Sequence, residues 1–144
     1  METHYENLLK KKNLSLTAVR LAVLEALRER PHADAACVYD LVRRRLSTAS
    51  RQAIFNNLHA LVEHGIIREI KPKGRPSLYE TRTGDNHHHL ICRRCQLIVD
   101  TDCPDAPPCL TPSDDHGFSI DEAEVILWGT CPQCKELINK QREK

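Results

Sequence analysis

Hydrophobic positions recur at helical spacing three times in the first half of the chain, each time behind a residue suited to cap a helix. The three apolar stripes are Leu16, Leu21, Leu24 and Leu27; Val38, Leu41 and Val42; and Ile54, Leu58, Leu61 and Val62. The caps are Thr17, Asp34 and Ser50. Pro31 prevents the first helix from continuing, and Gly65 suits the left-handed turn that ends the third. We therefore predict three helices between residues 16 and 65.

The pattern changes after Gly65. "IIREI" and "LYET" predict two strands, and the turn "KPKGRPS" between them carries Lys71, Lys73 and Arg75. Helices followed by a hairpin with a basic tip are typical of a winged helix-turn-helix. The outer face of the third helix bears Arg51, Gln52, Asn56 and His59. Such side chains reach base edges and phosphates when a helix enters the major groove of DNA.

Charge distinguishes a DNA-binding module from a protein-binding one, since both can contain three helices and a hairpin. The formal net charge is +1, yet residues 1–83 hold 15 Lys and Arg against 9 Asp and Glu, while residues 84–144 hold 6 against 11. A basic half predicts contact with a polyanion, and an acidic half predicts cation binding or self-association. The predicted DNA-binding residues are Arg20, Ser50, Arg51, Gln52, Phe55, Asn56, Lys73 and Arg75.

The sequence does not suggest a membrane or secreted protein. No apolar run approaches the roughly 20 residues of a membrane span, and the N-terminus lacks a signal peptide's apolar region. We therefore expect a cytoplasmic protein without a membrane partner.

Cysteines dominate the chemistry of the second half. In a reducing compartment, seven cysteines more often bind metal or serve redox chemistry than form disulfides. Cys37, on an apolar helix, is expected in the core, and Cys103 and Cys109 stay open between a redox pair and inert thiols.

Two C-x-x-C pairs predict a structural zinc site of four cysteines. Cys92 and Cys95 form the first pair, and Cys131 and Cys134 the second. Each pair makes a turn that directs two thiolates toward one point, and zinc joins the distant segments. The alternative is a thioredoxin-like redox dithiol at "CPQC", which needs a strand-to-helix context in a larger α/β unit and no second pair.

Strand parity separates the histidines from the cysteine site. If "HHHLIC" is extended, His87 and His89 point one way while His88 and Cys92 point the other. "QLIVDTD" also predicts a strand, whose Asp100 can bring a carboxylate to the histidine face. Imidazole with carboxylate suits Fe(II), Mn(II), Zn(II) or Co(II), so a second, regulatory metal is indicated.

These motifs together resemble the ferric uptake regulator family of metal-dependent repressors. The resemblance rests on "SRQAIFNNLHALVEHGII", "SLYE", "HHHLICRRCQLIVD" and "CPQC", in that order over nearly the whole chain. The tail from residue 100 resembles the actinobacterial branch associated with catalase-peroxidase control. The family's pattern implies a regulatory metal site at His32, Glu80, His87, His89 and Asp100, with Fe(II) or Mn(II) as the cation. It also implies a homodimer whose two heads bind double-stranded operator DNA.

Asp100 decides between two kinds of regulator. Peroxide sensors of the family resemble this chain in carrying aspartate there, whereas iron sensors tend to have glutamate. The resemblance thus implies a repressor released by hydrogen peroxide through Fe(II)-catalysed oxidation of a ligand histidine. The alternative is an iron-, zinc- or manganese-responsive repressor without peroxide sensing. Two departures from the pattern weigh against a simple transfer, namely Glu80 where some peroxide sensors have aspartate and Phe55 where many members have tyrosine.

A metalloenzyme is the hypothesis from another class, and the sequence argues against it. The motif HExxH is absent, and the H-x-E at His4 to Glu6 is not followed by a P-C-x-x-C. We therefore expect no enzyme. The predicted fold class is α+β, with a winged helix-turn-helix in residues 1–83 that binds DNA. Residues 84–144 are expected to form a small α/β domain for dimerisation and metal binding, in which "EVILWG" is a strand with Val125, Leu127 and Trp128 available for burial.

Overall fold

The computed structural model describes residues 4–81, 87–102, 112–120 and 123–142. The chain divides into two compact units, unit 1 with residues 1–83 and unit 2 with residues 84–144. The predicted domain boundary, together with Cys103 and Cys109, lies outside the described residues. None of the described helices has the length and apolar character that a bilayer-spanning segment requires.

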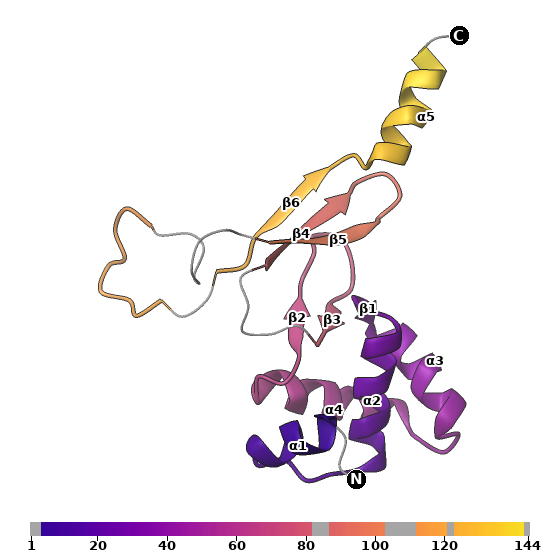
Figure 1. Ribbon diagram of the computed structural model, residues 1–144, viewed down its shortest axis with the longest axis vertical. Helices are drawn as coiled ribbons and strands as arrows, with labels where there is room; N and C mark the ends of the chain where they lie inside the picture. The colour runs from indigo at the N-terminus through magenta and orange to yellow at the C-terminus, as the bar shows by residue number, and fades with distance from the viewer. Residues whose placement is uncertain (1–3, 82–86, 103–111, 121–122, 143–144) are drawn as a thin grey trace. The chain divides into compact units, whose positions relative to one another are not determined.

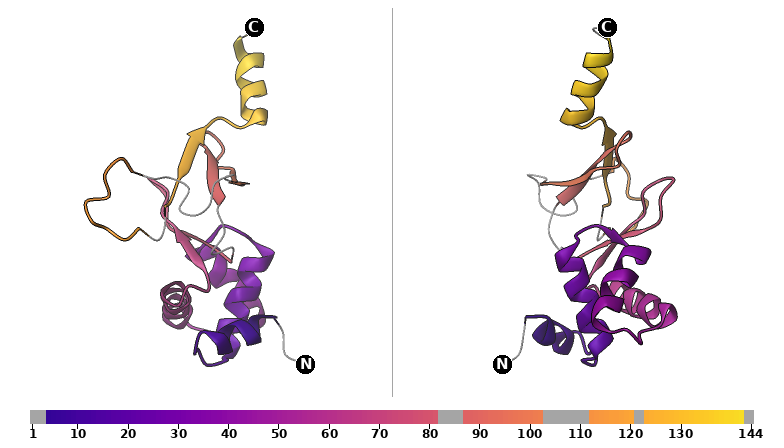
Figure 2. Two further views of the ribbon diagram at one scale, coloured as in Figure 1. Left: turned by 60° about the vertical axis from the view of Figure 1, so that its left-hand side comes forward. Right: turned by 90° about the vertical axis from the view of Figure 1, so that its right-hand side faces the viewer.

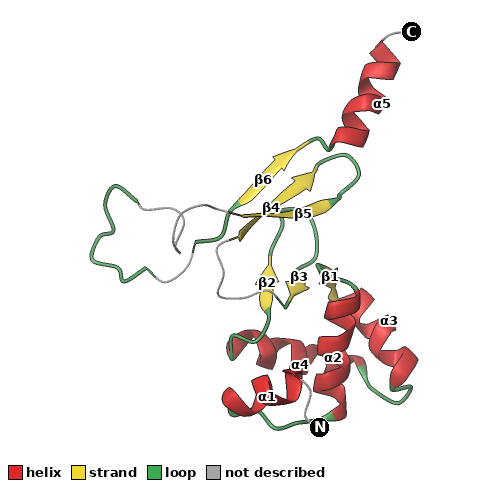
Figure 3. Cartoon of the chain, in the orientation of Figure 1, coloured by secondary structure: helices red, strands yellow, loops and turns green. Residues whose placement is uncertain are grey.

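Unit 1 contains four helices and a small sheet (Figure 1). Its helices are α1 (His4–Lys11), α2 (Ala18–Glu29), α3 (Ala35–Arg45) and α4 (Arg51–Glu63). Its strands are β1 (Ala33–Asp34), β2 (Arg68–Ile70) and β3 (Leu78–Glu80), in the order β1-β3-β2 and antiparallel throughout. Figure 3 shows β2 and β3 as the wing that follows α4, while β1 lies between α2 and α3 in the chain. The short helix α1 and strand β1 were not predicted.

The caps of α2, α3 and α4 are those predicted. The side chains of Thr17, Asp34 and Ser50 each accept a hydrogen bond from the amide three residues on, at 3.1, 2.8 and 3.1 Å. These bonds satisfy amides that the first helical turn leaves without partners. Gly65 has a φ of +69° directly after α4, as the turn requires.

The core of unit 1 lies between α2, α3 and α4. The buried residues of the predicted stripes are Leu24, Leu27, Val38, Leu41, Val42, Ile54, Leu58 and Leu61. Leu21 and Val62 are partly buried against this cluster. Leu16 was predicted to share the first stripe, which is wrong, because α2 begins only after the cap Thr17 and Leu16 is 49 % exposed. Leu9 of α1 adds an apolar side chain that the pattern analysis missed.

In its described residues, unit 2 contains one sheet of three strands and one helix. Strand β4 (His87–Cys92) lies between β5 (Ile98–Asp102), to which it is antiparallel, and β6 (Ile126–Gly129), to which it is parallel. Helix α5 (Pro132–Arg142) continues beyond the end of β6 in both views of Figure 2. The two units together confirm the predicted α+β class.

Unit 2 buries little apolar surface. Among its described residues, Ile91, Cys92 and Cys134 are the buried hydrophobic ones. Val125, Leu127 and Trp128 were predicted to be available for burial; Val125 and Trp128 are half-buried within the unit, whereas Leu127 is 49 % exposed. The physical reason is parity, because Leu127 pairs with Leu90 on a sheet face that no described element of the unit covers. The unit must therefore depend on something besides its own apolar core.

Candidate metal centres and DNA-binding surface

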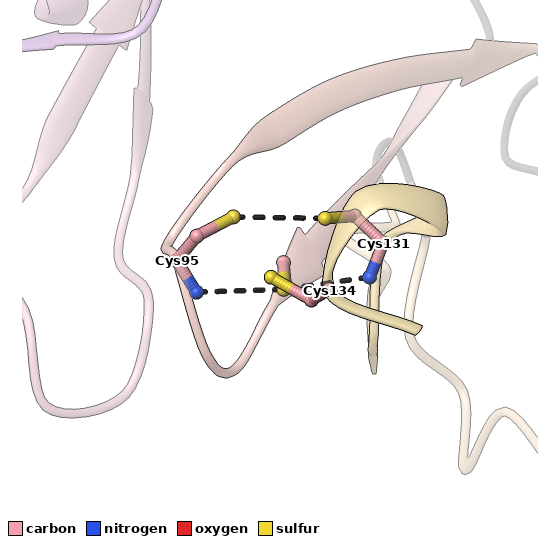
Figure 4. A group of neighbouring side chains, drawn as sticks. Cys95, Cys131 and Cys134 are labelled. Carbon is pink, nitrogen blue, oxygen red and sulfur yellow. Dashed lines mark hydrogen bonds between the residues drawn. The ribbon is translucent and has the colours of Figure 1, made fainter. Parts of the chain in front are cut away.

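The four predicted cysteines of unit 2 form one cluster. Their Sγ atoms all lie within 4.8 Å of one another, and none of the four is in a disulfide. Cys92 ends β4, and Cys95 lies in the turn that follows. Cys131 directly precedes α5 and Cys134 lies in its first turn, so that Cys95, Cys131 and Cys134 face one another (Figure 4). The Sγ atoms of Cys95 and Cys131 are 3.7 Å apart. Four sulfurs at about 2.3 Å from one zinc ion have tetrahedral edges of about 3.8 Å, so the cluster fits zinc.

Backbone geometry prepares one cysteine as a thiolate. The Sγ of Cys92 accepts hydrogen bonds from the amides of Cys95 at 3.5 Å and Cys131 at 3.4 Å. These two amides lower the pKa of Cys92 to about 6. Hydrogen bonding with the Cys131 thiol and burial raise the pKa of Cys134 to about 12. All four thiols would lose their protons on binding a metal cation, because the cation displaces the thiol protons.

The turn between Cys92 and β5 positions the first pair of cysteines for metal binding. Gln96 takes a left-handed φ of +67° and donates from its amide to the Cys92 carbonyl at 3.0 Å. The Cys92 amide donates to the Leu97 carbonyl at 2.9 Å, which closes the loop from the other side. The turn thereby brings the first pair of cysteines to the N-terminus of α5. The second pair, Cys131 and Cys134, follows strand β6 and begins helix α5, which is the strand-to-helix setting of a redox dithiol. Its sulfurs nevertheless share one cluster with those of the first pair, which a redox dithiol does not require.

Two histidines and one aspartate converge within unit 2. His89 and Asp100 are direct partners in the β4–β5 register, and the His89 Nε2 atom lies 3.3 Å from the Asp100 carboxylate. The His87 Nε2 atom lies 3.9 Å from the same oxygen, and the two imidazole rings are 4.9 Å apart. The alternation of β4 puts both histidines on one face, as predicted. The three groups offer two nitrogen ligands and one oxygen ligand.

A second histidine–carboxylate pair lies within unit 1. The β1–β3 register pairs Ala33 with Tyr79, so His32 comes opposite Glu80 one residue further on. The His32 Nε2 atom lies 3.1 Å from the Glu80 carboxylate. His32 has a φ of +66°, which is uncommon for a residue with a side chain and directs its imidazole toward β3. Each unit therefore brings together its own share of the five predicted ligands.

The predicted DNA-binding residues lie at the start of α4 and on the wing, apart from Arg20, which lies in α2. Arg51, Gln52, Phe55 and Asn56 are exposed on α4, and Gln52 donates to Asn56 at 2.8 Å. Lys73 is exposed at the tip between β2 and β3, whereas Arg75 is half-buried. Ser50 is engaged as the cap of α4. Arg20 donates to the carbonyl and hydroxyl of Ser15, both at 2.7 Å, so it also fastens the loop before α2.

The sequence analysis missed two residues of this surface, Tyr39 and Arg43 of α3. The guanidinium carbons of Arg51 and Arg43 lie 4.4 and 5.4 Å from the centre of the Tyr39 ring. The i, i+4 spacing of Tyr39 and Arg43 was a visible sign of one contact. The contact with Arg51 depends on how α3 packs against α4, which the spacing does not give.

Comparison with known proteins fixes the family. Residues 11–127 match the ferric uptake regulator family. The chain belongs to this family. It is 50 % identical over 131 residues to the transcriptional regulator FurA of Mycobacterium tuberculosis, covering 90 % of this chain and 89 % of that protein. It is 48 % identical to ferric uptake regulation protein 2 of Mycolicibacterium fortuitum over 134 residues, or 90 % of this chain and 92 % of the relative.

Peroxide regulators are more distant relatives of this ferric uptake regulator family member. The peroxide operon regulator of Bacillus subtilis is 28 % identical over 134 residues, covering 91 % of each chain. Among solved structures, the Campylobacter jejuni peroxide stress regulator superposes with a TM-score of 0.66 at 22 % identity, covering 93 % of this chain and all of that one. A zinc uptake regulator complexed with zinc and DNA gives 0.65 at 20 % identity, with 94 % and 93 % covered. These structures confirm the fold.

Proposed function

We propose that this protein is a metal-responsive transcriptional repressor that binds operator DNA as a homodimer. The observation that carries the proposal is the pairing of His89 with Asp100 in unit 2 and of His32 with Glu80 in unit 1, together with the exposed polar side chains of α4 in unit 1. Membership of the ferric uptake regulator family makes DNA the expected partner. The relatives near 50 % identity are named as FurA and ferric uptake regulators, which favours metal level as the signal.

In this proposal, His32 and Glu80 of unit 1 hold the same divalent cation as His87, His89 and Asp100 of unit 2. Nitrogen and oxygen donors suit Fe(II) or Mn(II), while the cysteine cluster holds zinc permanently. A cation shared by both units restricts their relative orientation, so the two α4 helices of a dimer match two half-sites in successive major grooves. Linkage then requires DNA to tighten metal binding by the same factor that metal tightens DNA binding.

The dimer is supported by an apolar row on the sheet of unit 2. Leu90, Val99 and Leu127 are 42, 45 and 49 % exposed. Leu90 pairs with Val99 in β5 and with Leu127 in β6, so the three side chains lie side by side across all three strands. The row is on the face opposite His87 and His89. We propose that a second copy of this chain covers it, because a two-fold dimer apposes the same row from each subunit.

The test is metal-dependent DNA binding with a matched pair of histidine variants. The full chain, loaded with one zinc per cysteine cluster, would select duplexes from a randomised library in Mn(II). Fluorescence anisotropy on the selected duplex would then be followed as Mn(II) is added. We expect His89→Ala to lose the metal dependence and His88→Ala, on the opposite face of the same strand, to keep it. Equal metal dependence in both variants would exclude the proposed regulatory site.

Release by hydrogen peroxide is the second candidate, and Asp100 is the observation that favours it. Peroxide would oxidise a ligand imidazole, which gains one oxygen atom at a ring carbon while the peroxide leaves as water; bound Fe(II) supplies the redox activation. The variant Asp100→Glu separates this candidate from plain metal sensing. If peroxide is the signal, the Fe(II) form of the wild type should lose DNA at low peroxide, with one added oxygen on His32 or His87 by mass spectrometry. Equal resistance of the Fe(II) and Mn(II) forms would leave metal level as the signal.

A further inference from the structure

Tyr39 lies where helices α3 and α4 meet, and two arginines share its ring. The guanidinium of Arg51, the first residue of α4, lies over the ring with its central carbon 4.4 Å from the ring centre. The guanidinium of Arg43, one turn further along α3, lies 5.4 Å from the same centre. Both distances are within the range of a cation–π contact. The aromatic ring thus holds a positive charge that belongs to the predicted DNA-binding helix.

Arg43 fixes the ring in relation to the start of α4. Its Nη1 atom donates to the Tyr39 hydroxyl at 3.1 Å and to the carbonyl of Ala49 at 3.0 Å. Ala49 directly precedes Ser50, the cap of α4. One guanidinium therefore ties the tyrosine to the turn from which α4 begins, so the ring is a fixed support for Arg51 and not a mobile surface side chain.

The charges around Arg51 favour its contact with the Tyr39 ring. The first turn of α4 has no acidic residue, and the positive end of its dipole, Arg43 and Arg51 all repel one another. The electron-rich face of the ring offsets part of that repulsion. Tyr39 and Arg51 also line a pocket of about 230 Å³ together with Gln52 and Phe55, two further predicted DNA contacts. The guanidinium is consequently held beside the side chains that would meet DNA.

We infer that Tyr39 is a positioning residue that holds the Arg51 guanidinium ready for DNA. An exposed arginine samples many rotamers, and a contact with DNA must freeze them. The ring freezes them beforehand, so less conformational entropy is lost on binding. This inference rests on the proposed DNA-binding function and adds a residue to it that does not itself need to touch DNA.

The test is a double-mutant cycle in duplex affinity, using the zinc- and Mn(II)-loaded full chain and a duplex selected by the wild type. We expect Tyr39→Leu to weaken binding about fivefold, the cost of ordering one long side chain. Tyr39→Phe keeps the ring face and loses only the hydrogen bond from Arg43, so it should weaken binding less than Tyr39→Leu, by about twofold. In the Arg51→Ala background, Tyr39→Leu should have no further effect. Arg44→Ala, which removes one charge from the neighbouring position of α3, is the control for overall charge.

The inference would be overturned if Tyr39→Leu bound DNA with wild-type affinity. It would also be overturned if Tyr39→Leu lost the same factor in affinity with and without Arg51, which would indicate a structural role only. If Tyr39→Leu does not fold, as thermal unfolding would show, Arg51→Lys replaces it, because an ammonium keeps the charge but loses the planar stack. Wild-type affinity for Arg51→Lys would then refute the positioning role. Metal-independent DNA binding by the wild type, with the cycle as expected, would overturn the metal response in the proposed function and still support the positioning role of Tyr39. Failure of the wild type to bind any duplex would overturn both.

Discussion

Removal of the zinc site should unfold unit 2 and leave unit 1 intact. The change is Cys134→Ser, which replaces one ligand by a hydroxyl that binds zinc weakly. Cys95 and Cys131, whose sulfurs touch, are 36 residues apart in the chain. Closing a loop of that length costs about 4 kcal/mol in chain entropy. Full burial of a side chain such as Ile91 returns roughly 1.5–3 kcal/mol, so the sheet cannot close this loop without metal.

Helix α5 provides the observable for this prediction. Cys134 is its one buried residue among those described, and a free helix of 11 residues is marginally stable in water. Because α5 holds about a fifth of the described α-helical residues, the far-ultraviolet circular dichroism should fall by about a fifth. Zinc content by mass spectrometry should fall from one per chain to near zero. Unit 1 keeps its own core and should still unfold cooperatively on heating.

Cys37→Ser is the matched control, because it removes a half-buried thiol of α3 that is outside the cluster. It should keep one zinc per chain and the full helical signal. The reasoning would be refuted if Cys134→Ser retained both zinc and helix. It would be refuted equally if chelation of zinc from the wild type left the circular dichroism unchanged.

Three further predictions test the proposed surfaces and the core. Leu90→Asp should weaken the dimer about 30-fold or more by placing a charge at the centre of an apolar interface, and an unchanged sedimentation profile would disprove the proposed dimer face. Leu58→Ala should lower the free energy of unfolding of unit 1 by about 2–5 kcal/mol in urea, whereas exposed Leu16→Ala should change it by less than about 0.5; similar values for both would contradict the core assignment. Lys73→Ala should reduce the slope of log affinity against log salt by about 1, and an unaltered slope would remove the wing tip from the DNA contacts.

Local chemistry explains what the sequence could predict. Helix starts followed from Thr17, Asp34 and Ser50, because a cap acts within one turn of its own helix. The cysteine cluster followed from two spaced pairs, since each pair is a self-contained turn. Strand alternation placed His87 and His89 on one face, and the short connection to β5 brought Asp100 opposite His89. In each case the determining residues are neighbours in sequence or in a single hairpin.

Tertiary packing explains what it could not. Leu127 was expected to be available for burial because it is apolar in a strand, but alternation gives only the face of the sheet and not what covers that face. The stack of Arg51 on Tyr39 depends on the packing of α3 against α4, which no sequence spacing encodes. The pairing of His32 with Glu80 was expected from family resemblance alone, because β1 has only two residues and no recognisable strand pattern.

Departures from local preference coincide with the proposed functional residues. His32 takes a left-handed backbone that costs about 1–3 kcal/mol, and Arg51 adds positive charge at the positive end of α4. Leu90 exposes an apolar side chain that burial would stabilise. The binding of a different proposed ligand would offset the free-energy cost of each departure: a cation at His32, DNA at Arg51 and a second copy of the chain at Leu90. Because the three proposed ligands would bind at different surfaces, single substitutions can test metal binding, DNA binding and dimerisation separately before their linkage is measured.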